Sequence, residues 1–546
     1  MRLVRQTEGT WEAIRDAFQW EIPPSFNMAQ VVCDRHAADR DLVALYYEDE
    51  AGQARTYTFA EIRAAANRLA NVLAGLGIER GDRVGIVLPQ RPETAIAHVA
   101  IYKLAAIAVP LANLFGPEAL HYRLNDSGAK ALIIDGENLS KLTAIRERLP
   151  QLQHMILVDG PSCDRQPPTG EIEYAAAVQA ASPEFETAIT APDDPVVIIY
   201  TSGTTGPPKG ALHAHRYLLG HLPGFEMSHN FFPQPGDLGW TPADWAWIGG
   251  LMDLLMPCWY FGRPVLAYRA RKFDPEQALA MMVKYRVRNA FLPPTALKLL
   301  RQVPNVKQRF PLELRTIMSG GEALGAEVLH WAQSELGADV NEIYGQTEVN
   351  YVIGNCTPIA APTPGSMGRA YPGHTVEVVD DQGRVLPPGE LGEVAFRRDA
   401  DPVFFLRYWN APEATAEKFS GDWALSGDLA VKDEEGRFWF KGRKDDVIIS
   451  AGYRIGPAEV EEQLLRHPAV ALAAVIGVPD DLRGEVVKAF IKPAAGVQPT
   501  AALAAEIQQF VKEHLAAHEY PRHIEFVDSL PMTTTGKIMR RELRAR

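Results

Sequence analysis

One segment constrains the fold of this chain more than any other: the apolar run Val196–Tyr200, which leads directly into a loop rich in glycine and hydroxyl residues. Between Tyr200 and Gly210 the chain places three glycines, four Ser or Thr residues and Lys209. Glycines let backbone N–H groups turn toward an anion, while hydroxyls and a lysine add donors and positive charge. The segment therefore predicts a buried strand that ends in a phosphate-binding loop.

The spacing of this loop excludes the common P-loop, which needs Gly, four residues and then Gly-Lys-Ser/Thr. After Gly203 and the four residues that follow it, the chain has Pro208 where the P-loop has its second glycine, and Lys209 is followed by Gly210. A flexible surface turn is the other interpretation of so many glycines and prolines. The position of the loop directly after an apolar strand favours phosphate binding.

The first third of the chain alternates helix and strand patterns. Thr58 and Glu61 form a capping box, after which apolar residues recur at helical spacing as far as Leu76. Short apolar strands are expected at Val84–Leu88, Ala131–Ile134 and Met155–Val158, with a second helix at Glu93–Leu104. This alternation predicts βαβ units and a largely parallel sheet.

Two further regions follow, because 546 residues exceed what one hydrophobic core usually supports. After Ala361, paired turn signals separate short strands and predict a β-rich subdomain. The last hundred or so residues predict an α+β unit, with helices at Pro457–Arg466 and Ala501–His514. We therefore expect an α/β fold with a large domain at 1–444 and a small one at 445–546, separated by the charged segment around Asp445.

Composition narrows the class of function. A net charge of -13 argues against a nucleic-acid partner, although it permits an anionic ligand in a local basic site. The four cysteines are far apart and show no metal-ligand spacing, which is typical of reduced thiols in a cytoplasmic protein. We expect no membrane span and no secretory leader, since no apolar run is long enough for a span and the first residues lack an apolar core.

The loop at 200–210 resembles the phosphate-loop signature of the adenylate-forming superfamily. That superfamily includes acyl-CoA synthetases, the adenylation domains of peptide synthetases and firefly-type luciferases. Six further segments resemble its other motifs in the expected order over nearly the whole chain: 319–323, 344–348, 426–428, 442–446, 451–454 and 535–537. The chain is most similar to the medium-chain acyl-CoA synthetases, with aryl-CoA ligases close behind.

The resemblance implies ATP, Mg²⁺ and coenzyme A as cofactor and co-substrates. It assigns ATP or AMP binding to a set of loop and strand residues: Thr201, Ser202, Gly203, Thr204, Thr205, Gly206, Gly321, Glu322, Ala323, Tyr344, Gln346, Thr347, Asp428, Arg443 and Arg454. It assigns catalysis to Lys537, Thr347, Glu348 and Lys209, with Glu348 also holding the metal. It places a hinge at Asp445 and the approach of the coenzyme A thiol at Ala451, Gly452 and Tyr453.

The implied chemistry explains these residue types. A carboxylate must approach the α-phosphorus of ATP, so neutralising charge and positioning two anions dominate the barrier. No protein nucleophile is needed, and no Ser-His-Asp or Cys-His arrangement is evident. His213 and His215 follow the loop, and we expect them to be structural or to line a pocket.

Glycine and tryptophan residues near the expected acyl pocket indicate the size of the acid but not its identity. Gly345 stands where acetate-specific relatives carry a bulky aromatic residue, which predicts a deeper pocket. Trp245, Trp247 and Gly249 are expected to form its wall, although the two tryptophans are also compatible with the core. A medium-length, branched or aromatic monocarboxylate fits such a pocket.

Other functions remain compatible with these motifs. A peptide-synthetase module would normally continue into a carrier domain, whereas the sequence stops nine residues after Lys537. A luciferase-like oxygenase shares every motif and is distinguished by assay. An ATP-binding sensor would be expected to lack Lys537 or Glu348, and both are present. Monomer and homo-oligomer are both open.

Overall fold

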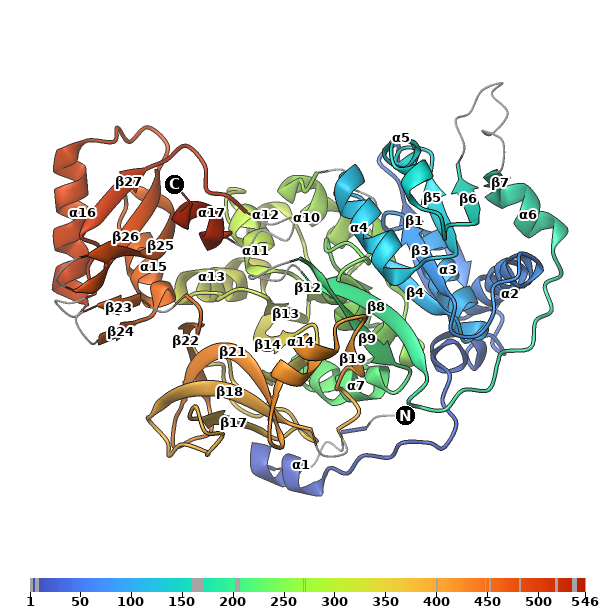
Figure 1. Cartoon of the computed structure of the whole chain (residues 1–546), viewed down its shortest axis with the longest axis horizontal. Coiled ribbons are helices and arrows are strands. Elements are labelled where there is room, and N and C mark those ends of the chain that lie inside the picture. The colour runs from blue at the N-terminus through green and yellow to red at the C-terminus, as the bar shows by residue number, and fades with distance from the viewer. Residues whose placement is uncertain are drawn as a thin grey trace.

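The computed structural model describes residues 3–4, 9–159, 171–201, 207–268, 270, 272–398, 401–446, 448–450, 453–480, 483–515, 519–532 and 538–545. The described residues form four sheets, of which the two largest are mainly parallel; Figure 1 shows their arrangement. Among the described residues, no helix combines the length and apolar character needed to cross a membrane.

The first large sheet has eight strands and contains the strand that precedes the phosphate loop. Its order is β19 (Arg407–Tyr408), β9 (Lys209–Ala214), β8 (Pro195–Thr201), β4 (Ile107–Pro110), β3 (Arg83–Val87), β5 (Ala131–Asp135), β6 (His154–Val158) and β7 (Glu171–Glu173). The strands from β8 to β7 pair in parallel, while β9 and β19 are antiparallel additions at one edge. The predicted parallel sheet is confirmed.

The helices that accompany this sheet begin with local signals. In α2 (Phe59–Gly75) the Thr58 hydroxyl accepts from the Glu61 N–H, and the Glu61 carboxylate accepts from the Thr58 N–H. The capping box is therefore confirmed. The other helices of the first 180 residues are α1 (Trp11–Ala17), η1 (Gln30–Asp34), α3 (Pro92–Lys103), α4 (Pro117–Ser127), α5 (Leu139–Thr143), η2 (Arg146–Arg148) and α6 (Tyr174–Ala180).

The second large sheet has nine strands. Its order is β16 (Arg369–Ala370), β15 (Asn350–Gly354), β14 (Asp339–Gln346), β13 (Thr316–Gly320), β12 (Asn289–Phe291), β10 (Gly239–Trp240), β11 (Val265–Tyr268), β1 (Val43–Glu48) and β2 (Ala54–Thr58). Strands β14 to β1 pair in parallel, and the outer strands are antiparallel. Because β13 and β14 are parallel neighbours, the residues that follow them lie at the same edge of the sheet.

The helices around the second sheet are mostly short. The longest is α7 (Tyr217–Ser228), every residue of which is buried. The others are α8 (Ile248–Gly250), η3 (Leu251–Leu255), α9 (Met256–Tyr260), α10 (Pro275–Lys284), α11 (Pro294–Leu300), α12 (Val306–Arg309), α13 (Ala326–Trp331) and η4 (Ala332–Leu336).

The predicted β-rich subdomain is an antiparallel sheet. It contains β17 (Val376–Val379), β18 (Leu391–Arg397), β20 (Phe419–Ser420), β21 (Trp423–Lys432) and β22 (Phe438–Arg443). The short helix α14 (Pro412–Glu417) directly precedes β20 in sequence.

The C-terminal α+β unit has its own sheet and its own apolar clusters, and Figure 1 shows it at one side of the rest of the chain. The sheet consists of β23 (Ile448–Ser450), β24 (Tyr453–Ile455), β25 (Val470–Asp480), β26 (Gly484–Pro493) and β27 (His523–Phe526). Its helices are α15 (Pro457–Leu465), α16 (Ala501–His514) and α17 (Arg540–Arg544). The expected fold class is thus confirmed, and the boundary at residues 444 and 445 stays a prediction.

Candidate active site

The phosphate loop joins two paired strands. Thr201 at the end of β8 lies opposite Lys209 at the start of β9, and the Thr201 hydroxyl donates to the Lys209 carbonyl at 3.3 Å. The loop is therefore the connection of a hairpin at one edge of the first sheet. Several predicted residues lie outside the described part of the chain: Ser202, Gly203, Thr204, Thr205, Gly206, Ala451, Gly452 and Lys537.

Tyr408 connects the two predicted catalytic groups Lys209 and Glu348. Its strand β19 pairs with β9, so the ring lies 5.4 Å from the Lys209 ammonium. Its hydroxyl donates to Glu348 Oε1, and the Glu348 side chain is largely buried. Burial beside this carboxylate raises the pKa of Tyr408, which keeps the hydroxyl protonated as a donor. The sequence interpretation missed Tyr408, because its aromatic neighbours indicate only a core strand.

The backbone of Thr347 and Glu348 is fixed by two hydrogen bonds. The Tyr217 hydroxyl on α7 donates to the Thr347 carbonyl at 2.8 Å, and the Phe405 N–H donates to the Glu348 carbonyl at 2.8 Å. The ring of His213 stacks on Tyr217 with centroids 3.8 Å apart. His213 is fully buried and burial lowers its pKa, so it is neutral packing behind the site. His215 is also buried, where its Nδ1 accepts from the Met28 N–H.

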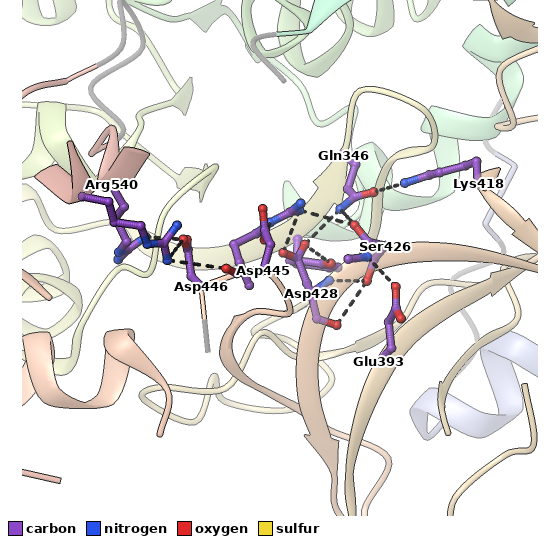
Figure 2. A network of polar contacts seen from close by, with 12 residues as sticks. Gln346, Glu393, Lys418, Ser426, Asp428, Asp445, Asp446 and Arg540 are labelled. Atoms are coloured by element: carbon purple, nitrogen blue, oxygen red, sulfur yellow. Dashed lines mark hydrogen bonds and ion pairs between the residues drawn. The ribbon is translucent and has the colours of Figure 1, made fainter. Parts of the chain in front are cut away.

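A second polar group surrounds Asp428 (Figure 2). Its Oδ2 accepts from the Tyr344 hydroxyl at 2.6 Å and from Gln346 Nε2 at 3.0 Å. Its Oδ1 accepts from Arg443 Nη1 at 3.1 Å across the β21–β22 pair. Four predicted residues therefore lie together: Tyr344, Gln346, Asp428 and Arg443.

Two side chains that the motifs do not include support this group. Lys418 donates to Gln346 Oε1 at 2.8 Å and fixes the amide so that its nitrogen faces Asp428. Glu393 accepts from the Gly427 N–H at 2.7 Å. Gly427 has a φ of +75°, and a Cβ there would lie 3.0 Å from the Arg443 guanidinium. The glycine thus permits both the turn and the close approach of the arginine.

The predicted adenine-binding turn follows β13. Gly321 has a φ of +92° with open space around its Cβ position, and Ala323 is exposed. Both carboxylate oxygens of Glu322 lie within hydrogen-bond distance of the Thr295 hydroxyl, at 2.9 and 3.1 Å. Because β13 and β14 are parallel neighbours, this turn and the Thr347–Glu348 segment occupy the same edge of the second sheet.

The four residues predicted for the acyl pocket differ in their surroundings. Trp245 is fully buried, which agrees with the core interpretation, whereas Trp247 is partly exposed and packs edge-on against Phe115 at 5.6 Å. A Cβ on Gly249 would lie 2.7 Å from the Phe291 ring. These contacts place an aromatic surface around the partly exposed 247–249 segment.

Gly345 has a structural explanation besides pocket depth. A Cβ on Gly345 would lie only 1.5 Å from the Asn350 carbonyl oxygen, because β14 and β15 have a register shift at this residue. In this chain the close approach of the two backbones leaves no room for a side chain at Gly345. Gly345 is exposed, but its lack of a side chain does not by itself measure the pocket.

The predicted hinge is part of an ionic network that extends into the C-terminal unit (Figure 2). Arg443 donates to Asp445 Oδ1 at 3.1 Å as well as to Asp428. The next residue, Asp446, accepts from Arg540 at 3.3 Å and from Arg544 at 2.8 Å. Tyr453 and Arg454 belong to β24, which pairs with β23.

Comparison with known proteins identifies the chain. Residues 33–409 match the AMP-binding enzyme family, and residues 459–537 match the AMP-binding enzyme C-terminal domain. The chain belongs to the AMP-binding enzyme family of acyl-CoA synthetases. The superfamily expected from the motifs is thus confirmed.

Relatives of this acyl-CoA synthetase cover nearly its full length. The acetyl-coenzyme A synthetase of Bacillus subtilis (strain 168) is 38% identical over 525 residues, which is 95% of this chain and 90% of that protein. The human mitochondrial acyl-coenzyme A synthetase ACSM4 is 35% identical over 96% of this chain and 91% of its own. The crystal structure of the anthranilate CoA ligase AuaEII with anthranoyl-AMP has a TM-score of 0.86 and 30% identity, and covers 96% of this chain and 98% of that one.

As an AMP-forming acyl-CoA synthetase, the enzyme uses ATP, a carboxylic acid and coenzyme A, with Mg²⁺ as the usual metal of the family. The donor set fits that metal. In the described residues no cluster of three His, Cys, Asp or Glu side chains could form an all-protein site. Glu348 supplies one oxygen bound to Tyr408 and a second with no hydrogen-bond partner among the described residues. Mg²⁺ typically binds through one or two carboxylates together with substrate phosphates.

Proposed function

We propose that this acyl-CoA synthetase activates a medium-length, branched or aromatic carboxylic acid as its acyl-adenylate and then transfers the acyl group to coenzyme A. The observation that carries the proposal is the convergence of Lys209 and Glu348 on Tyr408. This cluster and the Asp428 group are joined through the continuous segment from Tyr344 to Glu348. The segment therefore links a cationic phosphate site to a carboxylate suited to a ribose.

In the first step, we assign charge neutralisation to the loop and positioning to the motif at 347–348. Thr201, the N–H groups and hydroxyls of 202–206 and Lys209 would hold the triphosphate, while Thr347 contacts the α-phosphate. Glu348 would hold Mg²⁺, which neutralises phosphate charge when bound. Lys537 would bring the acid carboxylate to the α-phosphorus. Two anions can then meet without a protein nucleophile.

We assign the nucleoside to residues from the second large sheet, the β-rich subdomain and the C-terminal unit. A carboxylate with both oxygens aimed by donors, such as Asp428, can still accept from two ribose hydroxyls because each oxygen has a second lone pair. Arg443 beside it also reaches the ribose, and Tyr344 and Gln346 hold the carboxylate in place. Gly321, Glu322 and Ala323 would face the adenine, and Arg454 completes the set.

For the second step, we propose that the unit at 445–546 rotates relative to 1–444 about Asp445. The rotation would remove Lys537 and bring Ala451, Gly452 and Tyr453 to the acyl-adenylate. The network around Arg443, Asp445 and Asp446 supports a hinge here, because ionic contacts at a partly exposed segment can be exchanged at modest cost.

The aromatic surroundings of the 247–249 segment support the choice of acid. Trp247, Phe115 and Phe291 offer apolar faces beside Gly249. An aryl acid is the specific alternative within this class, since the anthranilate CoA ligase and the benzoate CoA ligase from Burkholderia xenovorans LB400 have similar folds, with TM-scores of 0.86 and 0.82.

We also propose a cytoplasmic location. Cys33, Cys258 and Cys356 are buried free thiols, and burial raises the pKa of each. Buried reduced thiols are typical of a reducing compartment. Cell fractionation with an antibody against the protein checks this assignment.

An AMP-release assay over a panel of acids, with and without coenzyme A, tests the proposed function. The panel includes acetate, C4 to C12 straight and branched acids, and benzoates. We expect turnover with coenzyme A to be highest for acids larger than acetate and to yield the thioester. Acid-dependent AMP release at the same rate with and without coenzyme A would contradict its role as the acyl acceptor. Inactivity with every acid would favour an ATP-binding sensor.

A further inference from the structure

Asp253 is a carboxyl group inside the apolar core beside the site. It belongs to η3 (Leu251–Leu255), a π-helical turn of the kind often found at functional sites. Its neighbours Met252 and Leu254 are fully buried, and Asp253 itself is only 4% exposed. Burial raises its pKa to about 8, so the group is mainly neutral near pH 7 and can both donate and accept a hydrogen bond.

Only one of its two oxygens is paired. Asn350 Nδ2 donates to Asp253 Oδ1 at 2.6 Å, whereas Oδ2 has no hydrogen-bond partner among the described residues. Oδ2 is not one of the fully enclosed side-chain atoms that lack a partner, so it retains some accessible surface. A ligand group beside this surface would supply the hydrogen bond that the described residues do not.

The unpaired oxygen lies next to the predicted acyl pocket. Asp253 Oδ2 is 3.7 Å from the position that a Cβ on Gly249 would occupy, and the Phe291 ring is 2.7 Å from the same point. Gly249 is partly exposed, as is Trp247 two residues before it. The Gly249 position, where a side chain is absent, therefore borders both the Phe291 ring and Oδ2.

Asn350 links the same carboxyl group to the reacting end of the site. Its carbonyl oxygen packs against Gly345, two residues before Thr347. Asp253 and Asn350 thus form one polar pair, bordered by Gly249 on one side and Gly345 on the other. The acyl chain of an acid held beside Thr347 would run along an aromatic wall toward this pair.

We propose that Asp253 and Asn350 form a polar end of the acyl pocket and select an acid that carries a hydroxyl or amino group over the same acid without it. The inference rests on the proposed function and makes its substrate class narrower. Oδ2 accepts from the substituent or, with the carboxyl neutral, donates to it. A site with a buried polar group rejects an analogue that leaves the group unpaired more strongly than an apolar pocket rejects an added methylene.

The test compares kcat/KM in acid-dependent ATP–pyrophosphate exchange for matched acids. The pairs are benzoate against its hydroxy and amino derivatives at each ring position, and hexanoate against 6-hydroxyhexanoate. We expect the wild-type enzyme to prefer at least one substituted acid about tenfold or more over its parent. Exchange with no preference for any substituted acid overturns this inference but not the proposed function, whereas no exchange with any acid overturns the proposed function.

Variants assign the preference to Asp253. Asp253→Leu should abolish or invert it through the KM of the acid while the KM of ATP is unchanged, and Asp253→Asn should retain it because an amide also donates and accepts. Asp244→Asn is the matched control: Asp244 accepts from the Ala246 N–H at 3.0 Å on the same segment, so its replacement should leave the preference unchanged. A preference that persists in a folded Asp253→Leu protein contradicts the assignment. If that variant does not fold, the smaller Asp253→Ala replaces it with the same expected loss.

Discussion

At the scale of single residues, the contribution of Tyr408 to Mg²⁺ binding through Glu348 can be measured directly. Its hydroxyl aims Glu348, and a hydrogen bond to a charged group is worth about 1.5–3 kcal/mol. Tyr408→Phe should therefore raise the Mg²⁺ concentration needed for half-maximal exchange by about tenfold. It should also reduce the thermal stabilisation by ATP with Mg²⁺ more than the stabilisation by ATP alone.

The control for Tyr408 is Tyr371→Phe. Tyr371 is fully buried, and its hydroxyl donates to the Asn355 carbonyl at 3.2 Å, away from Glu348. Its loss should leave the Mg²⁺ requirement unchanged. An unaltered requirement in folded Tyr408→Phe would show that the tyrosine does not position the carboxylate.

Asp253 also predicts a pH dependence of stability. Its pKa in the folded protein, about 8, lies above the ordinary value of 3.8, so folding favours the protonated form. The contribution of this protonated group to the free energy of unfolding is fully present below pH 3.8 and is lost as the pH rises toward 8. Asp253→Asn should therefore lose less thermal stability than wild type between pH 5 and pH 8, by roughly 1–3 °C in Tm. Parallel Tm–pH curves for the two proteins would contradict this.

At the scale of elements, a substitution at Gly345 distinguishes two explanations for the glycine: the depth of the pocket and the close approach of β14 and β15. If the glycine only deepened the pocket, Gly345→Ala would act chiefly on large acids. The Cβ position 1.5 Å from the Asn350 oxygen instead predicts that β14 and β15 separate. We expect exchange to fall at least about a hundredfold for every acid, acetate included, as typical of misplaced reacting groups.

Gly75→Ala provides a glycine control. Gly75 ends α2, and its Cβ position has no neighbour within 4 Å. This substitution should be neutral or slightly stabilising. A selective loss of large acids in Gly345→Ala, with acetate unaffected, would restore the pocket-depth interpretation.

The short helix α17 is tied to the start of the C-terminal unit by Arg540. The guanidinium donates to Glu461 at 2.7 and 2.8 Å and to Asp446 at 3.3 Å, and both carboxylates are largely buried. Arg540→Ala would leave the largely buried Glu461 without its cationic partner, at a cost of about 3–5 kcal/mol, while Asp446 keeps its contact with Arg544. We expect a lower Tm and faster proteolysis in the C-terminal unit.

Arg541→Ala is the corresponding control, because Arg541 is exposed on the same helix. Its Tm should stay within about 1 °C of wild type, as for most surface substitutions. Equal stability of the Arg540 and Arg541 variants would rule out the anchoring role.

Elements were predictable where the signals are local. The helix expected at Ala501–His514 has those bounds, because Thr500 caps it through the Leu503 N–H. The π-helical turn at Leu251–Leu255 and the register shift at Gly345 were not predictable, since both depend on packing against distant strands. The position of Tyr408 depends on the pairing of β19 with β9, strands about two hundred residues apart in sequence.

At the scale of the whole molecule, the ordered motifs predicted the family because each supplies a group that one reaction needs. They could not predict which residues hold those groups in place. Lys418 and Tyr408 act through neighbours that are distant in sequence, and only the folded chain brings them together.

The two-step account makes opposite predictions for two parts of the C-terminal unit. Lys537→Ala should abolish adenylation and leave thioester formation from supplied acyl-adenylate largely intact. Gly452→Trp should block thioester formation while exchange survives. Assaying both half-reactions on both variants checks the proposed rotation, and equal loss of both half-reactions in either variant would contradict it.

The most direct measurement of the central claim is ATP–pyrophosphate exchange by the wild-type enzyme without coenzyme A, followed by addition of coenzyme A. The account predicts exchange that requires the acid and Mg²⁺ but not coenzyme A, and then equal amounts of AMP and acyl-CoA once the thiol is present. Absence of exchange until coenzyme A is added, or formation of ADP in place of AMP, would contradict it.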